Sequence, residues 1–355
     1  MSEVIFPSVE TPAVLVDTEI AGRNIARYQA YCNEHGLKLR PHIKTHKLPR
    51  FAELQVSTGA VGITCQKLSE AEAMTAGTKL DDVLLTYDVV GEAKQTRLRT
   101  LAEKINLSVV ADSAVVVDGL AEAMAGAERP LTVLIECDTG ANRCGVMSPE
   151  SAAALAAHIA GKDSLHFGGL MTYPVVGGTG AVQDFMTRTR DLIERFGFTV
   201  ETITSGGSPD MWKAHEAPII TEYRPGTYIY NDRSLVARGV CGFDDCALSV
   251  LATVVSVPEA RRAIIDAGSK VLTSDLLGLS GYGHVLGRAD IAIDQLSEEH
   301  GRLVSEQPIG LSVGDRVRIV PNHCCVVSNM LDEVVLVRGG TVIGNEPVAA
   351  RGKVW

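Results

Sequence analysis

The chain has 355 residues, with 33 Lys and Arg against 43 Asp and Glu and a formal net charge of −10. This acidic balance argues against nucleic-acid binding, which needs a basic surface to neutralise phosphates. Hydrophobic residues make up 46% of the chain and charged residues 21%, which is typical of a compact globular protein and excludes global disorder. No run approaches the ~18 apolar residues of a membrane span and no leader pattern is evident, so we expect a cytoplasmic protein without a membrane partner.

The first part of the chain alternates between short apolar runs and longer segments with helical spacing. Each run is followed by a helical stretch, such as 69–77, 91–104, 148–160 or 182–196. This alternation predicts an α/β fold, a (β/α)8 TIM-like barrel, and an open doubly wound sheet is the alternative. The expected strands are Ala13–Asp17, Lys38–His42, Gly62–Cys65, Val83–Tyr87, Leu107–Ala111, Thr132–Cys137, Gly168–Tyr173 and Thr199–Thr204.

After Gly239 the pattern changes to strand-like runs separated by Gly, Pro and Asp turns. We therefore expect a barrel domain over residues 10–238 and an all-β C-terminal domain over residues 239–355, with which residues 1–9 could pack. The expected strands here are Ala247–Val257, Ala263–Asp266, Asp315–Val320 and Glu333–Val337.

Eight cysteines are too dilute for a disulfide framework in a chain of this length. Six of them lie mostly inside apolar runs, and we expect buried thiols without a redox role at Cys32, Cys65, Cys137, Cys144, Cys241 and Cys246.

A cluster of basic residues, Arg-Pro-His42-Ile-Lys44-Thr-His-Lys, follows the second expected strand. Strand ends of a barrel point into the active-site face, and residues two apart leave an extended strand on the same side. A lysine in a barrel mouth is desolvated, which lowers its pKa and suits it to form a Schiff base. A solvated basic loop is the alternative.

A glycine-rich segment, Ser205-Gly206-Gly207-Ser208, follows the last expected barrel strand. Glycines let backbone N–H groups approach an anion, and this part of a barrel is a frequent phosphate site. A tight turn would explain the segment equally well. Together with a strand-end lysine, however, it suggests pyridoxal 5′-phosphate held at both ends.

A third group, Pro-Asn-His323-Cys324-Cys325, lies in the expected β domain. His323 and Cys325 are two apart on what we expect to be an extended segment, so they would face the same way and chelate one ion. Imidazole and thiolate suit zinc, and two ligands leave room for water or substrate. The alternative is a core cysteine beside a hydrogen-bonded histidine.

In combination, these segments resemble the D-threonine aldolase and D-serine dehydratase family, the metal-dependent members of the alanine-racemase-like fold type III pyridoxal phosphate enzymes. The resemblance extends over nearly the whole chain in the right order. The motifs that carry it are the Lys44 and His323 segments, Gly-Ile-Thr-Cys-Gln-Lys67, Asp138-Thr-Gly-Ala-Asn-Arg143-Cys-Gly, Ser205–Ser208, Arg224-Pro-Gly-Thr-Tyr228 and Ser297-Glu-Glu-His300-Gly.

The resemblance implies a homodimer and a set of site residues. Lys44 would carry the cofactor, with His42 beside it, and Arg143 and Tyr173 would lie around its ring. The phosphate would be held by Ser205, Gly206, Gly207 and Ser208, with help from Tyr228 or Tyr230. A divalent ion, Zn²⁺ before Mn²⁺, would bind His323 and Cys325 next to the substrate's β-hydroxyl. We assign no step of the reaction to Glu298, Glu299 and His300, which could be solvated loop residues.

The resemblance also implies a small D-3-hydroxy-amino acid as substrate and one of two lyase reactions. Dehydration would give a 2-oxo acid and ammonia, as in D-serine and D-3-hydroxyaspartate dehydratases, whereas carbon–carbon cleavage would give glycine and an aldehyde. Two departures from the aldolase pattern favour dehydration. Cys325 stands where aldolases carry an aspartate, and Pro174 follows Tyr173 where they tend to carry a histidine.

Three other functions are weaker alternatives. A racemase would need bases on both faces of Cα and would leave the metal pair without a role. A pyridoxal phosphate carrier would not need a β domain. A metal-dependent barrel hydrolase would need more His and Asp residues at strand ends.

Overall fold

The computed structural model describes residues 6–355, which divide into two compact units. The barrel unit comprises Tyr28–Lys44, Pro49–Gly226 and Lys353–Trp355. The β unit comprises the described residues as far as Arg27, together with Thr45–Leu48 and Thr227–Gly352. In the described part of the chain, no helix is long and apolar enough to cross a membrane.

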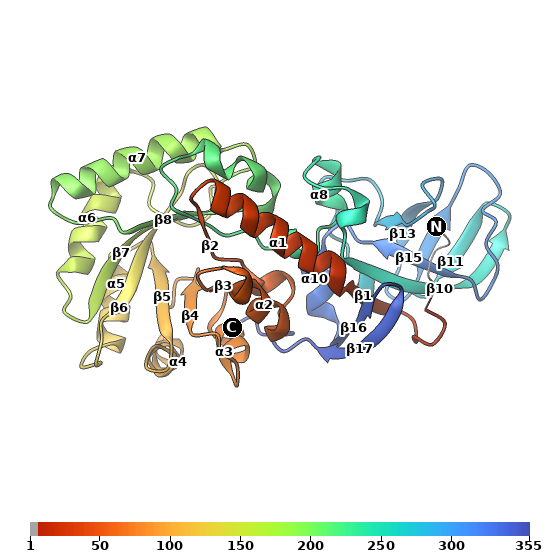
Figure 1. Cartoon of the computed structure of the whole chain (residues 1–355), viewed down its shortest axis with the longest axis horizontal. Coiled ribbons are helices and arrows are strands. Elements are labelled where there is room, and N and C mark those ends of the chain that lie inside the picture. Colours follow the sequence, from red (N-terminus) through yellow and green to blue (C-terminus); the bar gives the residue numbers. More distant parts are fainter. Residues whose placement is uncertain (1–5) are drawn as a thin grey trace. The chain divides into compact units, whose positions relative to one another are not determined.

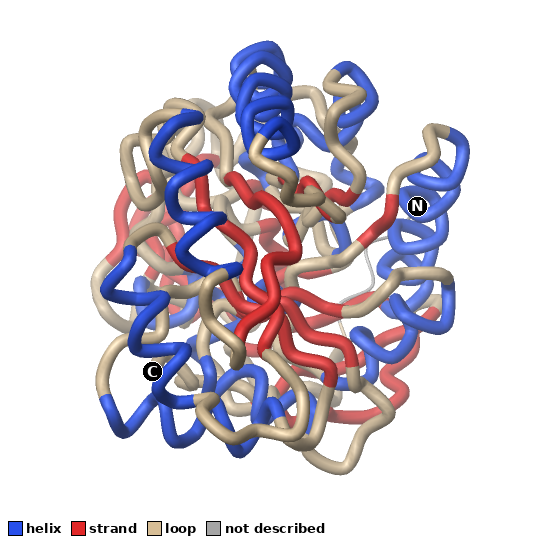
Figure 2. The backbone as a smooth tube through the Cα atoms, turned by 90° about the vertical axis from the view of Figure 1, so that its left-hand side faces the viewer, coloured by secondary structure: helices blue, strands red, loops and turns tan. Residues whose placement is uncertain are grey.

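The barrel unit is built on eight parallel strands in the order β2-β9-β8-β7-β6-β5-β4-β3 (Figure 1). An isolated parallel bridge between His42 and Thr64 joins the two ends of this order and closes the ring. Figure 2 looks onto this unit, with strands at the centre and helices around them. The strands are β2 (Lys38–Leu39), β3 (Ile63–Cys65), β4 (Asp82–Leu85), β5 (Asn106–Ala111), β6 (Leu131–Cys137), β7 (Leu165–Thr172), β8 (Thr202–Ser205) and β9 (Glu222–Tyr223).

Helices follow these strands in the alternation that the sequence predicts, and inward-facing apolar residues pack between neighbouring strands. Leu84, Val110, Leu134 and Met171 form one such buried cluster from β4 to β7. The helices are α1 (Thr18–Glu34), α2 (Pro49–Thr58), α3 (Leu68–Thr75), α4 (Glu92–Ala102), α5 (Ala114–Ala123), α6 (Pro149–Ala160) and α7 (Thr179–Arg195), with 3-10 turns η1 (Ile43–Thr45) and η2 (Ser208–Glu216).

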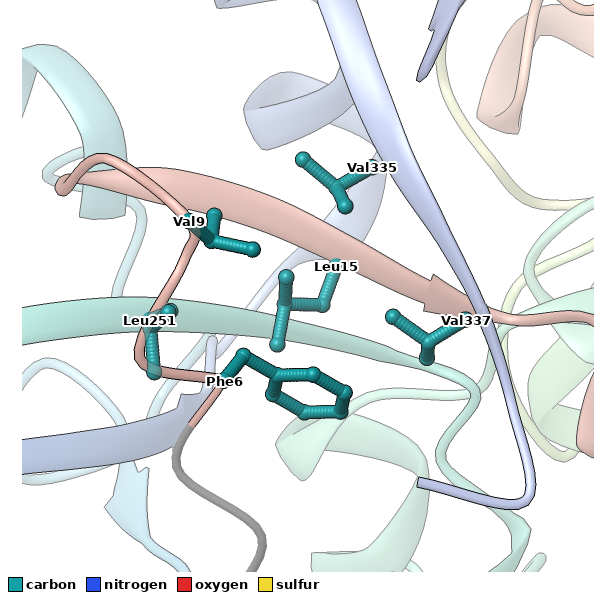
Figure 3. Packing of buried hydrophobic residues seen from close by; sticks show 6 residues of the cluster. All are labelled: Phe6, Val9, Leu15, Leu251, Val335 and Val337. Carbon is teal, nitrogen blue, oxygen red and sulfur yellow. The ribbon is translucent and has the colours of Figure 1, made fainter. Parts of the chain in front are cut away.

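The β unit contains a nine-stranded sheet with the path β13-β14-β11-β10-β1-β16-β17, and β15 joins β10 to β12. Its core includes Phe6, Val9, Leu15, Leu251, Val335 and Val337 (Figure 3). The strands are β1 (Ala13–Asp17), β10 (Leu248–Glu259), β11 (Arg262–Ile265), β12 (His284–Val285), β13 (Ala292–Leu296), β14 (Gly301–Val304), β15 (Arg316–Val320), β16 (Glu333–Arg338) and β17 (Thr341–Pro347). Short helical segments are η3 (Thr227–Ile229), α8 (Arg233–Ala237), η4 (Phe243–Asp245), α9 (Ser269–Leu272) and α10 (Cys324–Met330).

The predicted fold class is confirmed, but one strand was assigned to the wrong sheet. Ala13–Asp17 pairs with β10 and β16 in the β unit, so it is not the first barrel strand. The missing barrel strand is β9, which has only two residues and pairs with β8 and β2. A strand of this length carries no period that a sequence pattern could reveal.

Two site segments also differ in conformation from the expected strands. β2 ends at Leu39, and Lys44 lies on the 3-10 turn η1 instead of an extended continuation. His323 is extended, but Cys324 and Cys325 begin helix α10. The alternation of side chains along a strand therefore does not explain how either pair is arranged.

Candidate active site

Lys44 lies beyond the carboxyl end of β2, the first barrel strand, among buried neighbours while its own side chain is partly exposed. The backbone N–H of Lys44 donates to His42 Nδ1 at 3.4 Å, and His42 Nε2 lies 3.2 Å from Gln66 Oε1. Because Nδ1 accepts a hydrogen bond, neutral His42 carries its proton on Nε2 and donates it to Gln66. Gln66 Nε2 in turn donates to Thr86 O at 2.7 Å. This network fixes the backbone around Lys44 along the rim formed by β2, β3 and β4.

Arg143 and Tyr173 meet at the ends of β6 and β7. The Arg143 guanidinium lies 4.7 Å from the centroid of the Tyr173 ring, and it also contacts Glu136 at 3.4 Å. Asp138 folds the intervening loop by accepting hydrogen bonds from the N–H groups of Gly140 and Arg143. Burial by itself would raise the pKa of Asp138, but these backbone donors outweigh it and keep the pKa below its usual range. The structure thus brings together two residues that the sequence placed around the cofactor ring.

The glycine-rich segment begins at the carboxyl end of β8. A Cβ on Gly206 would lie 2.7 Å from Arg224 O, so only glycine fits this close approach. Gly207 has φ of +146°, and its carbonyl accepts a hydrogen bond from Tyr223 Oη at 2.9 Å. Ser208 Oγ is buried and has no hydrogen-bond partner among residues 6–355. A buried hydroxyl without a partner costs free energy, and a phosphate oxygen would supply the missing partner.

Pyridoxal phosphate therefore fits the residues of the barrel unit. The glycine-rich segment after β8, which could bind a phosphate, and the amine of Lys44 beyond β2 lie on the carboxyl-end face, where (β/α)8 barrels bind their ligands. Lys44, His42, Arg143, Tyr173 and the Ser205–Ser208 segment would hold the cofactor.

The metal pair lies in the β unit, at the start of α10. His323 Nδ1 lies 2.8 Å from Asp275 Oδ2, which leaves Nε2 for a metal ion. Cys325 Sγ lies 3.1 Å from Thr45 Oγ1 and 3.6 Å from Thr227 Oγ1. Asp232 accepts the N–H of Cys324 at 3.2 Å and so fixes the first turn of the helix.

The electrostatic surroundings favour a charged pair at His323 and Cys325. A hydrogen bond from Cys324 holds the pKa of the Cys325 thiol well below its usual range, against burial, and His323 adds to this effect. Burial lowers the pKa of His323, but hydrogen bonds with Cys325 and Asp275 outweigh it and raise the pKa to about 9. The Cys325 thiolate and the imidazole that remains when a metal ion displaces the proton of His323 are a donor set that suits zinc. In the described chain, no group of three or more His, Cys, Asp or Glu could hold a metal ion, so water or substrate would complete the coordination.

Some expected contributions remain predictions. Tyr228 and Tyr230 are buried in the β unit, and their role toward a phosphate is a prediction, whereas Tyr223 contacts the glycine-rich segment within the barrel unit. Glu298 and Glu299 form ion pairs with Lys270 on the surface.

Cys144 is exposed and Cys241 partly exposed, so the expectation of buried thiols is wrong for Cys144, whose loop carries it outward.

Sequence reasoning missed several polar residues of these sites because each depends on a contact between distant segments. Asp275 is 48 positions from His323 and Gln66 is 24 positions from His42. Tyr223 belongs to the two-residue strand β9. Gln66 and Tyr87 are polar residues of the barrel rim that each follow a strand. This position was the only signal in the sequence that could have indicated them as site residues.

Comparison with known proteins shows the family of this chain. The family model described as "Alanine racemase, N-terminal domain" matches residues 16–234, and "Putative serine dehydratase domain" matches residues 247–337. D-threonine aldolase of Arthrobacter sp. is 32% identical, over 97% of this chain and 93% of the relative. D-threo-3-hydroxyaspartate dehydratase of Delftia sp. is 31% identical, over 90% of this chain and 91% of the relative.

Solved structures extend this likeness. The crystal structure of D-threonine aldolase from Filomicrobium marinum has a TM-score of 0.91 and 33% identity, covering 99% of this chain and 98% of that one. Structures of the D-threo-3-hydroxyaspartate dehydratase include a His-to-Ala variant and, two positions further on, a Cys-to-Ala variant in the metal-free form. The metal-free variant has a TM-score of 0.86 and 26% identity, covering 98% of this chain and 99% of that one. This chain belongs to the D-threonine aldolase and D-serine dehydratase family, and it is a pyridoxal phosphate-dependent lyase of D-3-hydroxy-amino acids.

Proposed function

We propose that this enzyme dehydrates D-3-hydroxy-amino acids to a 2-oxo acid and ammonia, with zinc as its metal ion. The observation that carries the proposal is the pair of His323 and Cys325, in which Asp275 contacts His323 Nδ1 while Thr45 and Thr227 contact Cys325 Sγ. Structures of a D-threo-3-hydroxyaspartate dehydratase support it, because they include a Cys-to-Ala variant in the metal-free form and a His-to-Ala variant, and the substituted His and Cys have the same spacing as this pair.

Cofactor and metal ion are proposed to act on one substrate. The support is the family resemblance, which implies a divalent ion next to the substrate's β-hydroxyl. When bound, pyridoxal phosphate supplies an electron sink for the electron pair left on Cα, and zinc supplies a Lewis acid for the β-hydroxyl.

The residues of the chain would bind the cofactor, orient Lys44 and move protons. Ser205–Ser208 would bind the phosphate, and Arg143 and Tyr173 would lie around the cofactor ring. His42 fixes the backbone of Lys44 through its Nδ1 atom. Lys44 Nζ would hold the cofactor and then take the proton from Cα, and this proton would pass to the hydroxide that leaves Cβ as water. His323 and Cys325 would hold the metal ion.

The alternative is carbon–carbon cleavage, supported by the likeness to D-threonine aldolase. Overall identity of 32% and 31% to an aldolase and a dehydratase does not separate the two. Cleavage needs a base for the β-hydroxyl proton, and Pro174, directly after Tyr173, offers no titratable group. Asp275 engages His323 Nδ1, so this nitrogen is not available as that base. Both observations favour dehydration.

Metal removal with D-serine as substrate tests the proposal. We expect that the enzyme as purified forms pyruvate and ammonia, that a chelator abolishes the reaction without removing the yellow colour of the cofactor, and that Zn²⁺ restores more activity than Mn²⁺. Activity that persists when metal analysis finds no ion would contradict a catalytic metal.

A further inference from the structure

Two lysines and a tyrosine meet on the barrel rim. Lys67 follows β3, Tyr87 follows β4, and Lys94 lies in the first turn of α4. Lys67 Nζ lies 3.6 Å from the centroid of the Tyr87 ring, and Lys94 Nζ donates to Tyr87 Oη at 2.8 Å. We name these three residues the rim cluster.

In the described part of the chain, no carboxylate neutralises the positive charge of the rim cluster. Within residues 6–355, neither lysine forms an ion pair, although acidic residues outnumber basic ones by 43 to 33 over the whole chain. Arg97, on the same helix as Lys94, pairs with Glu72 at 2.6 Å. Two like charges around one phenol repel each other, and a bound anion would offset this repulsion.

The phenol is also oriented to donate. Its oxygen accepts from Lys94, and its own O–H reaches no acceptor in the described chain. The hydrogen bond from Lys94 lowers the pKa of Tyr87, and the charge of Lys67 adds to the effect. A carboxylate, which accepts about four hydrogen bonds, matches two ammonium groups and one phenol.

Hydrogen bonds link the rim cluster to the segment of Lys44. In the order of the barrel strands, however, the cluster is far from the glycine-rich segment Ser205–Ser208. Lys67 and Tyr87 directly follow Gln66 and Thr86, which continue the network that begins at Lys44 and His42. In the ring of eight strands, β4 is opposite β8, the strand that leads into the glycine-rich segment. The anion that suits the cluster is therefore not the cofactor phosphate.

From this geometry we infer that Lys67, Tyr87 and Lys94 bind the distal carboxylate of a dicarboxylic substrate, a D-3-hydroxyaspartate-type amino acid. The inference rests on the proposed function, and it specifies the substrate class at the same site. It makes the three residues determinants of specificity, because D-threonine carries a methyl group where 3-hydroxyaspartate carries this carboxylate.

The test compares these two substrates in variants of the enzyme loaded with cofactor and metal. For Lys67→Gln, Lys94→Gln and Tyr87→Phe we expect kcat/KM for D-3-hydroxyaspartate to fall about tenfold more than for D-threonine. Lys104→Gln is the matched control, because it removes the same charge from an exposed position just beyond the opposite end of α4 and should change neither value. An equal loss with both substrates would overturn the inference, since it would place the cluster at the α-carboxylate that they share.

A binding measurement separates this inference from the proposed function. Calorimetry compares D-aspartate with D-alanine, neither of which has a β-hydroxyl to lose. We expect the wild type to bind D-aspartate more tightly and the Lys67→Gln, Lys94→Gln double variant to lose that preference. An unchanged preference overturns the inference, whatever products the enzyme makes. Glycine and aldehyde as products would overturn only the proposed dehydration.

Discussion

The carboxyl group of Asp88 lies just beyond β4, and burial raises its pKa to about 7, with the charges of Asp112 and Glu136 adding to the effect. A carboxyl whose pKa is higher in the folded state stabilises the fold below its unfolded pKa near 4, and this contribution is lost as the pH rises through 7. Asp88→Asn, which stays neutral, should therefore stabilise the enzyme at pH 8 more than at pH 4. Since Asp88 is partly exposed, we expect only about 1–2 kcal/mol.

Thermal unfolding of the enzyme as purified at pH 4, 6 and 8 measures this difference. Asp81→Asn, at an exposed position on the same segment, is the control and should show no such trend. A gain for Asp88→Asn that is equal at all three pH values would contradict the account of Asp88.

Lys44 is predicted to be the residue that holds the cofactor. Lys44→Ala should abolish both the visible absorbance and the turnover, because no other amine would replace its Nζ. Lys38→Ala, at an exposed position on β2, should retain both. A Lys44→Ala protein that stays yellow and active would remove Lys44 from the mechanism.

Asp275 is predicted to position His323 for the metal ion. Asp275→Asn should weaken zinc binding about 10- to 100-fold in a chelator competition, as is typical when the partner of a metal-binding histidine is lost. The cofactor absorbance should remain. Asp290→Asn, which removes an exposed partner of Arg288, is the control. A zinc affinity within twofold of the wild type would show that His323 binds metal without this carboxylate.

The sequence could predict the polar residues that follow long strands or lie in distinctive motifs. Lys44, Arg143, Ser208, His323 and Cys325 were singled out in this way or by the family resemblance, and their roles stay predictions. Their partners were not, because Asp275 and Gln66 reach them only through contacts between distant segments. The unpaired charge of the rim cluster depends on three segments and is visible only once they are folded.

At the scale of elements, Gly169 in β7 shows why one position of the barrel must be glycine. Its φ is +139°, it lies at a register shift between β6 and β7, and a Cβ would overlap the backbone oxygen of Thr202. Gly169→Ala should lower the free energy of unfolding by about 2–4 kcal/mol in thermal or denaturant unfolding.

Gly180→Ala is the matched control, because a Cβ on this glycine of helix α7 meets nothing within 4 Å. It should leave the free energy of unfolding unchanged or raise it slightly. Equal effects of the two substitutions would contradict the close approach of β7 and β8 at Gly169.

Long elements were predicted well, and short ones were not. Helices α4, α6 and α7 lie within a few residues of their expected bounds, because several turns repeat the apolar period. β1 has the expected bounds but pairs in the β unit, since an apolar run does not reveal its partner strand. The turn η1 and the helix α10 interrupt segments that looked extended, and both carry site residues.

The whole molecule contains a barrel unit that fits pyridoxal phosphate and a β unit that fits a metal ion. Family membership fixes the reaction class but leaves open which bond breaks. The homodimer that the sequence resemblance implies stays a prediction, which light scattering tests directly.

The most direct test of the central claim is product analysis with D-threonine, which can undergo either reaction. Purified enzyme loaded with cofactor and zinc is assayed for 2-oxobutanoate, ammonia, glycine and acetaldehyde in the same mixture. Dehydration predicts 2-oxobutanoate and ammonia in equal amounts, with both lost in Cys325→Ala. Glycine and acetaldehyde in equal amounts would contradict the account and make this enzyme an aldolase.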